Sequence, residues 1–152
     1  MNKSILVTGG LGYIGSHTVV DLITKGYKVT IVDNLSNSRI EILSNIEKIT
    51  GILPDFIQAN LIDYSKIENI FSTNNFDTVI HFAAFLFVDE SVEKPLDYYE
   101  NNLISLINVL KAMKQNKVEK IIFSSSCTVY GNPVSFPVTE ETPITKASSP
   151  YG

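Results

Sequence analysis

The stretch TGGLGYIG, residues Thr8 to Gly15, is the part of the sequence that decides the fold. It follows a short β-branched run, SILVT (Ser4–Thr8), and precedes HTVVDLITKG (His17–Gly26), whose apolar residues recur at helical spacing. A glycine-rich turn between a strand and a helix is typical of a pyrophosphate site, because glycines allow a tight turn and the helix N-terminus attracts phosphate. The glycines fit two patterns at once, Gly10-x-Gly12-x-x-Gly15 and Gly9-x-x-Gly12-x-x-Gly15. We therefore predict a dinucleotide-binding turn rather than a turn without a ligand.

An acidic residue supports this prediction. Asp33 ends the next apolar run, KVTIVD (Lys28–Asp33), about twenty residues past the glycines, where a carboxylate can accept hydrogen bonds from an adenosine ribose. The same carboxylate would repel a 2′-phosphate, and Asn34 rather than an arginine follows it, so NAD is favoured over NADP. Arg39 lies nearby in the sequence and keeps NADP open, and Asp33 as a plain strand-end turn residue is the alternative.

The remaining chain alternates between strand and helix patterns. Further strands are expected at 55–59 (DFIQA), 77–83 (DTVIHFA) and 120–126 (KIIFSSS), and further helices at 39–50, 65–74 and 95–115. Near-continuous apolar strands separated by helices indicate a parallel sheet covered on both faces, and right-handed crossovers make it doubly wound. No linker divides the chain, so we predict one α/β domain.

The composition and charge of the chain argue against several classes of function. The 152 residues are 44% hydrophobic and 18% charged, with a net charge of −4 and 12 scattered Lys and Arg, which argues against nucleic-acid or membrane binding. Cys127 is the single cysteine, so no internal disulfide can form. No signal peptide or membrane span fits, and we expect a cytoplasmic protein without a metal site.

Polar residues at two strand ends are further candidates. Ligands of open parallel sheets bind beyond the carboxyl ends of the strands, where the small Ala83 and Ala84 would permit close approach of a cofactor. His81 lies inside an apolar strand, so we interpret it, like His17, as a structural histidine rather than a general base. The serines of FSSSCTVYG (Phe123–Gly131) either cap the strand end or lie beside a nicotinamide pocket.

The motifs TGGLGYIGSHT, DNLSNS, VIHFAA, ESVEKPLDYYENN, FSSSCTVYG and SPYG occur in this order over essentially the whole chain. The sequence thereby resembles the N-terminal part of the UDP-glucose 4-epimerases, which are extended short-chain dehydrogenase/reductases. The resemblance implies a Rossmann-like NAD-binding fold, interconversion of UDP-glucose and UDP-galactose through a 4-keto intermediate, and a homodimer as full-length enzyme. The glycine motif is shared across the superfamily, whereas KPLDYYENN with SSSCTVYG is far more specific.

The resemblance also implies roles for individual residues. Ser126 and Tyr151 would be catalytic, the tyrosine opening a Tyr-x-x-x-Lys motif, and Ser124 and Tyr151 would lie near the nicotinamide. The other cofactor-binding residues would be Gly9, Gly12, Tyr13, Ile14, Gly15, Asp33, Asn34, Asn37, Asn60, Leu61, Phe82, Ala83, Ala84 and Asn101.

The sequence departs from the family pattern at several positions. Asn60 replaces a usual aspartate, and Leu86 stands where some members have a pyrophosphate-contacting lysine. Related 4,6-dehydratases place an Asp-Glu pair at Cys127 and Thr128, so dehydration would lack its proton carriers here. A UDP-N-acetylhexosamine or UDP-uronate 4-epimerase stays open as an alternative.

The sequence stops at Gly152, before the motif lysine and before the substrate domain that the resemblance implies. We therefore expect a sheet truncated after its fifth strand, a disordered Tyr151, and a fragment inactive alone. A non-catalytic dinucleotide-binding fragment is the alternative function.

Overall fold

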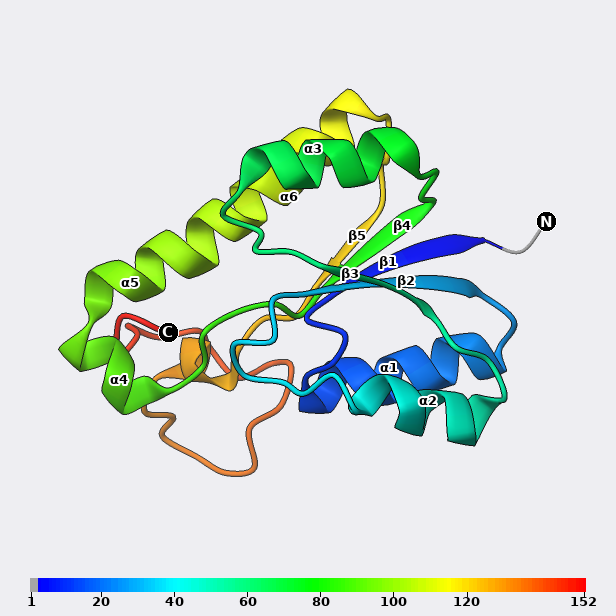
Figure 1. Cartoon of the computed structure of the whole chain (residues 1–152). Coiled ribbons are helices and arrows are strands. Elements are labelled where there is room, and N and C mark those ends of the chain that lie inside the picture. Colours follow the sequence, from blue (N-terminus) through cyan, green and yellow to red (C-terminus); the bar gives the residue numbers. More distant parts are fainter. Residues whose placement is uncertain (1–2) are drawn as a thin grey trace.

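Five parallel strands form one sheet in the order β3-β2-β1-β4-β5 in the computed structural model, which describes residues 3–152 (Figure 1). The strands are β1 (Ser4–Thr8), β2 (Lys28–Asp33), β3 (Asp55–Gln58), β4 (Thr78–His81) and β5 (Ile121–Phe123). In the central pairing, Ile5 lies opposite Thr78 and Thr8 opposite His81. The glycine turn after β1 and the loop after β4 therefore leave the sheet side by side.

Helices cover both faces of the sheet (Figure 1). Helices α1 (Tyr13–Thr24) and α2 (Ile42–Thr50) pack on one face, and α3 (Tyr64–Thr73) and α6 (Ser105–Gln115) pack on the other. Alternation along β1 divides the core, because Ile5 and Val7 join the cluster under α1 and α2, whereas Leu6 joins the cluster under α3 and α6. The predicted doubly wound α/β fold is confirmed.

Several predicted boundaries differ from the structure. Helix α1 begins at Tyr13, four residues before the predicted His17, since Gly12 is its N-cap and Gly15 is part of its first turn. Helix α2 begins at Ile42 rather than Arg39, after two turn hydrogen bonds. Strand β5 contains only Ile121–Phe123 of the predicted 120–126, because its ladder with β4 ends opposite His81.

The predicted helix at 95–115 is divided. It consists of α5 (Pro95–Tyr99), the π-helical turn η1 (Glu100–Ile104) and α6. Two further elements were not predicted, namely α4 (Val88–Glu93) and the 3₁₀ helix η2 (Cys127–Tyr130). Together α4, α5 and η1 connect the end of β4 to α6.

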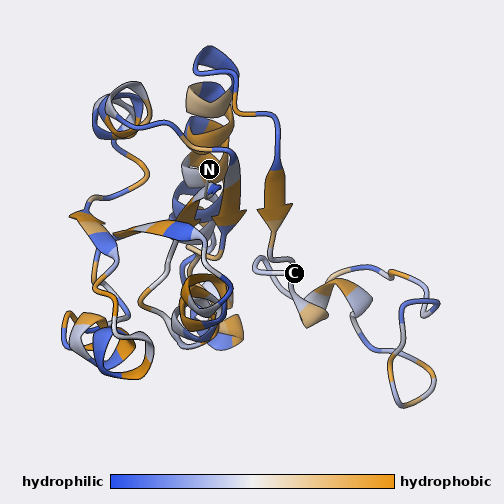
Figure 2. Cartoon of the chain, turned by 90° about the vertical axis from the view of Figure 1, so that its right-hand side faces the viewer, coloured by the Kyte–Doolittle hydropathy of each residue, from blue (hydrophilic) through white to orange (hydrophobic). Residues whose placement is uncertain are grey.

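Strand β5 lies at one edge of the sheet, where Figure 2 shows it in the orange of hydrophobic residues. Ile122 and Phe123 are 58% and 53% exposed. Within residues 3–152, no helix is both long and apolar enough to cross a lipid bilayer.

Candidate cofactor-binding and catalytic site

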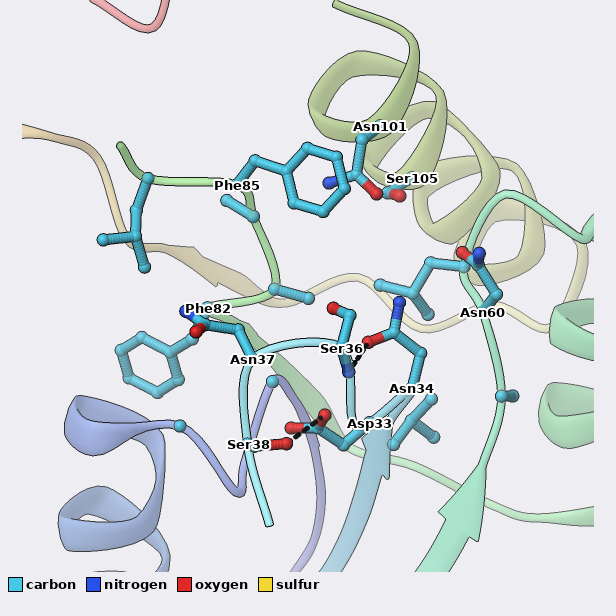
Figure 3. Close-up of a pocket in the computed structure, with 18 residues that line it drawn as sticks. Asp33, Asn34, Ser36, Asn37, Ser38, Asn60, Phe82, Phe85, Asn101 and Ser105 are labelled. Carbon is cyan, nitrogen blue, oxygen red and sulfur yellow. Dashed lines mark hydrogen bonds between the residues drawn. The ribbon is translucent and has the colours of Figure 1, made fainter. Parts of the chain in front are cut away.

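A cleft lies at the carboxyl ends of β1, β2 and β4 (Figure 3). The structure brings eleven of the predicted cofactor residues together around it: Gly9, Gly12, Asp33, Asn34, Asn37, Asn60, Leu61, Phe82, Ala83, Ala84 and Asn101. Ser36, Ser38, Val32, Ala59, Phe85, Leu86 and Ser105 also line it. This is the position at which open parallel sheets bind nucleotides.

The glycine turn is shaped by two close approaches of the backbone. Gly9 has a φ of +68°, and a Cβ there would lie 2.7 Å from the backbone nitrogen of Ala83. A Cβ on Gly15 would collide with the carbonyl oxygen of Gly9. Gly10 instead faces the side chain of Ile31 beneath the turn. Of the two glycine patterns that the sequence fits, Gly9-x-x-Gly12-x-x-Gly15 is therefore the one that shapes the cleft.

The N-terminus of α1 fits an anionic ligand. Its N-cap is Gly12, no side chain caps it, and its first turn holds no acidic residue. Free backbone N–H groups and the helix dipole therefore remain available to a phosphate group at this end. The side chains of Tyr13 and Ile14 are 84% and 61% exposed and do not line the cleft.

Asp33 organises both loops beside the cleft. Its Oδ2 accepts a hydrogen bond from the Leu11 backbone at 3.1 Å, and its Oδ1 accepts from Leu35 N at 2.9 Å and Ser38 Oγ at 2.8 Å. A carboxylate has about four acceptor positions, so these three bonds leave one for an external hydroxyl group. The residue fits the predicted ribose contact and is also a structural anchor, a second role that the sequence did not indicate.

The wall formed by Phe82–Leu86 is held by an asparagine that the sequence analysis missed. Asn102 Oδ1 accepts from Phe85 N at 2.8 Å, and Asn102 Nδ2 donates to Phe85 O at 3.0 Å. Asn101 donates to the same Oδ1 at 2.9 Å and lines the cleft beside Ser105 (Figure 3). Both asparagines lie in η1, where the π-helical turn differs from regular helix spacing, and such turns are frequent at functional sites.

The loop at Asn60–Ile62, which also borders the cleft, is fixed by the buried side-chain amide of Asn108. Asn108 Nδ2 donates to the carbonyl oxygens of Leu61 and Ile62, both at 2.9 Å. Asn60 uses its own Oδ1 to accept from Ile62 N at 3.1 Å. The amide that replaces the usual aspartate therefore retains the acceptor role within the loop. Asn108 is buried on α6, and only its polarity amid apolar helix positions could have indicated it.

His81 is the structural histidine that was predicted. It is 2% exposed, its Nδ1 lies 2.8 Å from Thr8 Oγ1, and its ring stacks on Phe123. Burial lowers the pKa of the imidazole from 6.5 to about 4. A neutral, buried and hydrogen-bonded imidazole at the end of β4 is suited to a structural role rather than to proton transfer. His17 binds the Tyr13 carbonyl oxygen on the surface of α1.

The predicted catalytic residues are not among the residues that line this cleft. Ser126 is the N-cap of η2 and accepts from Thr128 N at 3.2 Å, which is the strand-end capping arrangement. Ser124 N pairs with His81 O at 3.1 Å, and its side chain is exposed. The two positions at which related dehydratases have an Asp-Glu pair hold no carboxylate here: Cys127 is exposed, and Thr128 is hydrogen-bonded to Ser126.

Tyr151 makes two defined contacts, although we expected it to be disordered. Its backbone nitrogen donates to Ser91 Oγ at 3.3 Å, and its ring meets that of Tyr98 edge to face with centroids 6.3 Å apart. The expected disorder rested on the absence of a following helix, whereas these contacts come from α4 and α5, far earlier in the chain.

Two observations concern cations. Leu86 lines the cleft where a lysine was considered and is 47% exposed, so the wall lacks that cation. No group of three or more His, Cys, Asp or Glu side chains in residues 3–152 is arranged to hold a metal ion.

The strand order, the glycine turn and the acidic end of β2 define a Rossmann-like dinucleotide-binding fold. Within that class, the chain belongs to the GDP-mannose 4,6 dehydratase family, whose model matches residues 6–152. It is 49% identical over 149 residues to a UDP-glucose 4-epimerase of Yersinia enterocolitica, covering 98% of this chain and 44% of that protein. The chain thus spans less than half the length of this relative.

Solved structures agree with the sequence relatives. The UDP-glucose 4-epimerase of Bifidobacterium longum, solved in complex with NAD⁺ and UDP, superposes with a TM-score of 0.94 at 48% identity. That match covers 98% of this chain and 44% of the other. The UDP-Glc/GlcNAc 4-epimerase of Campylobacter jejuni superposes with a TM-score of 0.91 at 34% identity, covering 99% of this chain and 45% of the other.

Proposed function

We propose that residues 1–152 are the cofactor-binding domain of an NAD-dependent nucleotide-sugar 4-epimerase, with a separate substrate domain completing the enzyme. The observation that carries the proposal is the single cleft formed by Gly9, Gly12, Asp33 and the Ala83–Ala84 wall at the carboxyl ends of three strands. The relatives extend well beyond the length matched here, which leaves room for a substrate domain.

The residues of this chain have separable tasks in such a reaction. The α1 N-terminus and the glycine turn would hold the pyrophosphate, Asp33 a ribose hydroxyl, and Asn60 and Leu61 the adenine end. Bound NAD supplies the oxidising and reducing equivalent for carbon 4 of the sugar. Tyr151 would accept the proton of the 4-hydroxyl group, and Ser126 would hydrogen-bond the same oxygen. A nearby cation that stabilises the phenolate would assist Tyr151 in this role.

The substrate pair that we propose is UDP-glucose and UDP-galactose, which connects the protein to galactose metabolism. The named activity of the Yersinia relative supports it. The Campylobacter structure is described as a UDP-Glc/GlcNAc 4-epimerase, so a UDP-N-acetylhexosamine is the second candidate substrate, and a UDP-uronate is the third. Dehydration is disfavoured by the residues themselves, since Cys127 and Thr128 provide no acid–base pair.

We also propose a homodimeric, cytoplasmic protein that binds neither nucleic acid nor membrane. An apolar row along α5, η1 and α6 supports a dimer, since Leu96, Leu103 and Ile107 are 77%, 53% and 46% exposed. The scattered cations and the net charge of −4 support the absence of anionic partners.

The test is conversion of UDP-galactose by the purified full-length protein with added NAD, with sugar nucleotides separated by chromatography. We expect UDP-glucose as the product and a loss of about 100-fold or more in kcat for Tyr151→Phe. A 4-keto-6-deoxy sugar would instead identify a dehydratase. NAD binding by calorimetry without conversion of any UDP-sugar would identify the alternative, a non-catalytic dinucleotide-binding protein.

A further inference from the structure

The structure links the cofactor-cleft wall to Tyr151 through one buried side chain, that of Tyr98. Tyr98 lies on α5 and is 2% exposed. On one side its ring lies 5.5 Å from that of Phe85, centroid to centroid, and its hydroxyl accepts from Phe87 N at 3.0 Å. On the other side its ring meets that of Tyr151 edge to face.

The Tyr98 hydroxyl is anchored by charge. It donates to Glu90 Oε2 at 3.0 Å, and the other oxygen of Glu90 accepts from Lys94 Nζ at 3.1 Å. Burial, followed by the bond to Glu90, raises the pKa of the Tyr98 phenol above its usual value of 10.0. Tyr98 therefore stays a neutral donor at physiological pH and does not compete with Tyr151 as a base.

A second contact restrains the backbone of Tyr151. Ser91 on α4 is fully buried, its Oγ donates to Val88 O at 2.6 Å, and the same oxygen accepts from Tyr151 N at 3.3 Å. A backbone bond and an edge-to-face ring contact together restrain both the place and the direction of the Tyr151 side chain. Figure 1 shows the C-terminal turn beside α4 and α5, about sixty residues away in sequence.

We propose that Tyr98 and Ser91 are positioning residues for Tyr151, and that Tyr98 couples its orientation to the wall of the cofactor cleft. The inference rests on the proposed function, in which Tyr151 accepts the proton of the sugar hydroxyl. A proton acceptor works only at hydrogen-bond distance in the correct direction, and a displacement of about 1 Å can cost about 100-fold in rate. Edge-to-face aromatic pairs are favourable beyond the apolar area they bury, so this contact biases the Tyr151 ring toward one orientation.

Two substitutions at one position isolate the ring contact. Tyr98→Leu and Tyr98→Phe both lose the hydrogen bonds to Phe87 and Glu90, but only the phenylalanine keeps a ring against Tyr151. We expect kcat of Tyr98→Leu to fall at least about 10-fold below that of Tyr98→Phe. KM for the UDP-sugar and the Kd for NAD should agree within about twofold between the two variants. Equal kcat values, or a loss of NAD binding that matches the loss of kcat, would overturn the proposal.

Further variants keep the test decisive if the leucine variant does not fold. Ser91→Ala removes the acceptor for Tyr151 N with little change in volume, and should also lower kcat while KM stays constant. Tyr64→Leu is the matched control, because Tyr64 is a half-buried tyrosine on α3 that bonds Gln115. It should lose stability but keep kcat. Wild-type kcat in Ser91→Ala would remove the backbone part of the proposal.

A direct readout separates this inference from the proposed function. If the wild-type protein converts no UDP-sugar, the proposed function fails, and carbon-13 tyrosine spectra of full-length protein still report the Tyr151 ring. Its resonance, assigned from Tyr151→Phe, should shift in Tyr98→Leu and stay constant in Tyr64→Leu. An unchanged resonance in Tyr98→Leu would refute the positioning role independently of activity.

Discussion

Mild acid should destabilise this protein through His81, one of its two histidines. The imidazole is buried between Thr8 and Phe123 at the end of β4, and burial lowers its pKa from 6.5 to about 4. The unfolded chain therefore takes up a proton at this side chain near pH 6.5, whereas the folded protein resists protonation until about pH 4. Because the folded-state pKa is depressed, the stabilisation is complete above pH 6.5 and is lost as pH falls from there toward pH 4.

The size of the effect follows from the shift. One pKa unit corresponds to about 1.4 kcal/mol, so moving from 6.5 to about 4 corresponds to about 3 kcal/mol. The free energy of unfolding should fall by about 1.4 kcal/mol per pH unit within that window, and this contribution should level off below it. Such a loss is a large part of the ordinary stability of a domain.

Urea unfolding at several pH values across this window measures the effect. Carboxylates titrate at the lower end, so the comparison is between wild type, His81→Gln and His17→Gln, which share those carboxylates. His81→Gln should have lower stability at neutral pH but a flatter pH dependence, by about 3 kcal/mol across the window. His17→Gln, at the exposed histidine, should follow wild type. Parallel curves for wild type and His81→Gln would refute the reasoning, and the imidazole titration by NMR gives the pKa directly if the glutamine variant does not fold.

The other predictions address the cleft and the catalytic residues. The protein should bind NAD at least about tenfold more tightly than NADP because the Asp33 carboxylate opposes a 2′-phosphate; equal affinities in calorimetric titrations would contradict this. Gly9→Ala should cost about 2 kcal/mol more in urea unfolding than Gly26→Ala, because Gly26 has a φ of +84° but open space around it; equal costs would show that the close approach of Gly9 to the backbone of Phe82 and Ala83 is unimportant. Asn102→Leu should weaken NAD binding and cost about 2–4 kcal/mol through its three lost hydrogen bonds, and unchanged NAD affinity would remove its role in holding the wall. In the full-length enzyme, Ser126→Ala should lower kcat at least about 10-fold with little change in KM, and unchanged turnover would leave the serine only as the cap of η2.

The strands of the sheet could be predicted because the residues within each run and beside it are enough to indicate a strand. Runs such as Lys28–Asp33 are β-branched and bounded by turn residues, and that strand was predicted at its observed limits. The helix at 95–115 was predicted as regular because its apolar spacing is helical. Its π-helical turn at Glu100–Ile104 coincides with the hydrogen bonds of Asn102 to the backbone of Phe85, a contact that no spacing within the helix encodes.

The cofactor residues were predictable for a related reason. Parallel pairing places the residues that follow each strand at one edge of the sheet, so Gly9, Asp33 and Ala83 meet there once the strands are assigned. Their roles toward a cofactor stay predictions. The anchors Asn102 and Asn108 were missed because an asparagine gains a role only from the backbone group it meets, and those groups lie 17 to 47 residues away.

The two halves of the site should therefore respond differently to substitution. The cleft is continuous with the sheet, since the Thr8–His81 register sets Gly9 against Ala83, and any change that disturbs this pairing alters stability and cofactor binding together. Tyr151 instead depends on Ser91 and Tyr98, which lie in short helices outside the sheet ladder. Local opening of such a segment costs less free energy than opening the sheet. Substitutions in α4 and α5 should thus reduce turnover before they reduce NAD affinity or global stability, whereas substitutions under the glycine turn should reduce all three at once.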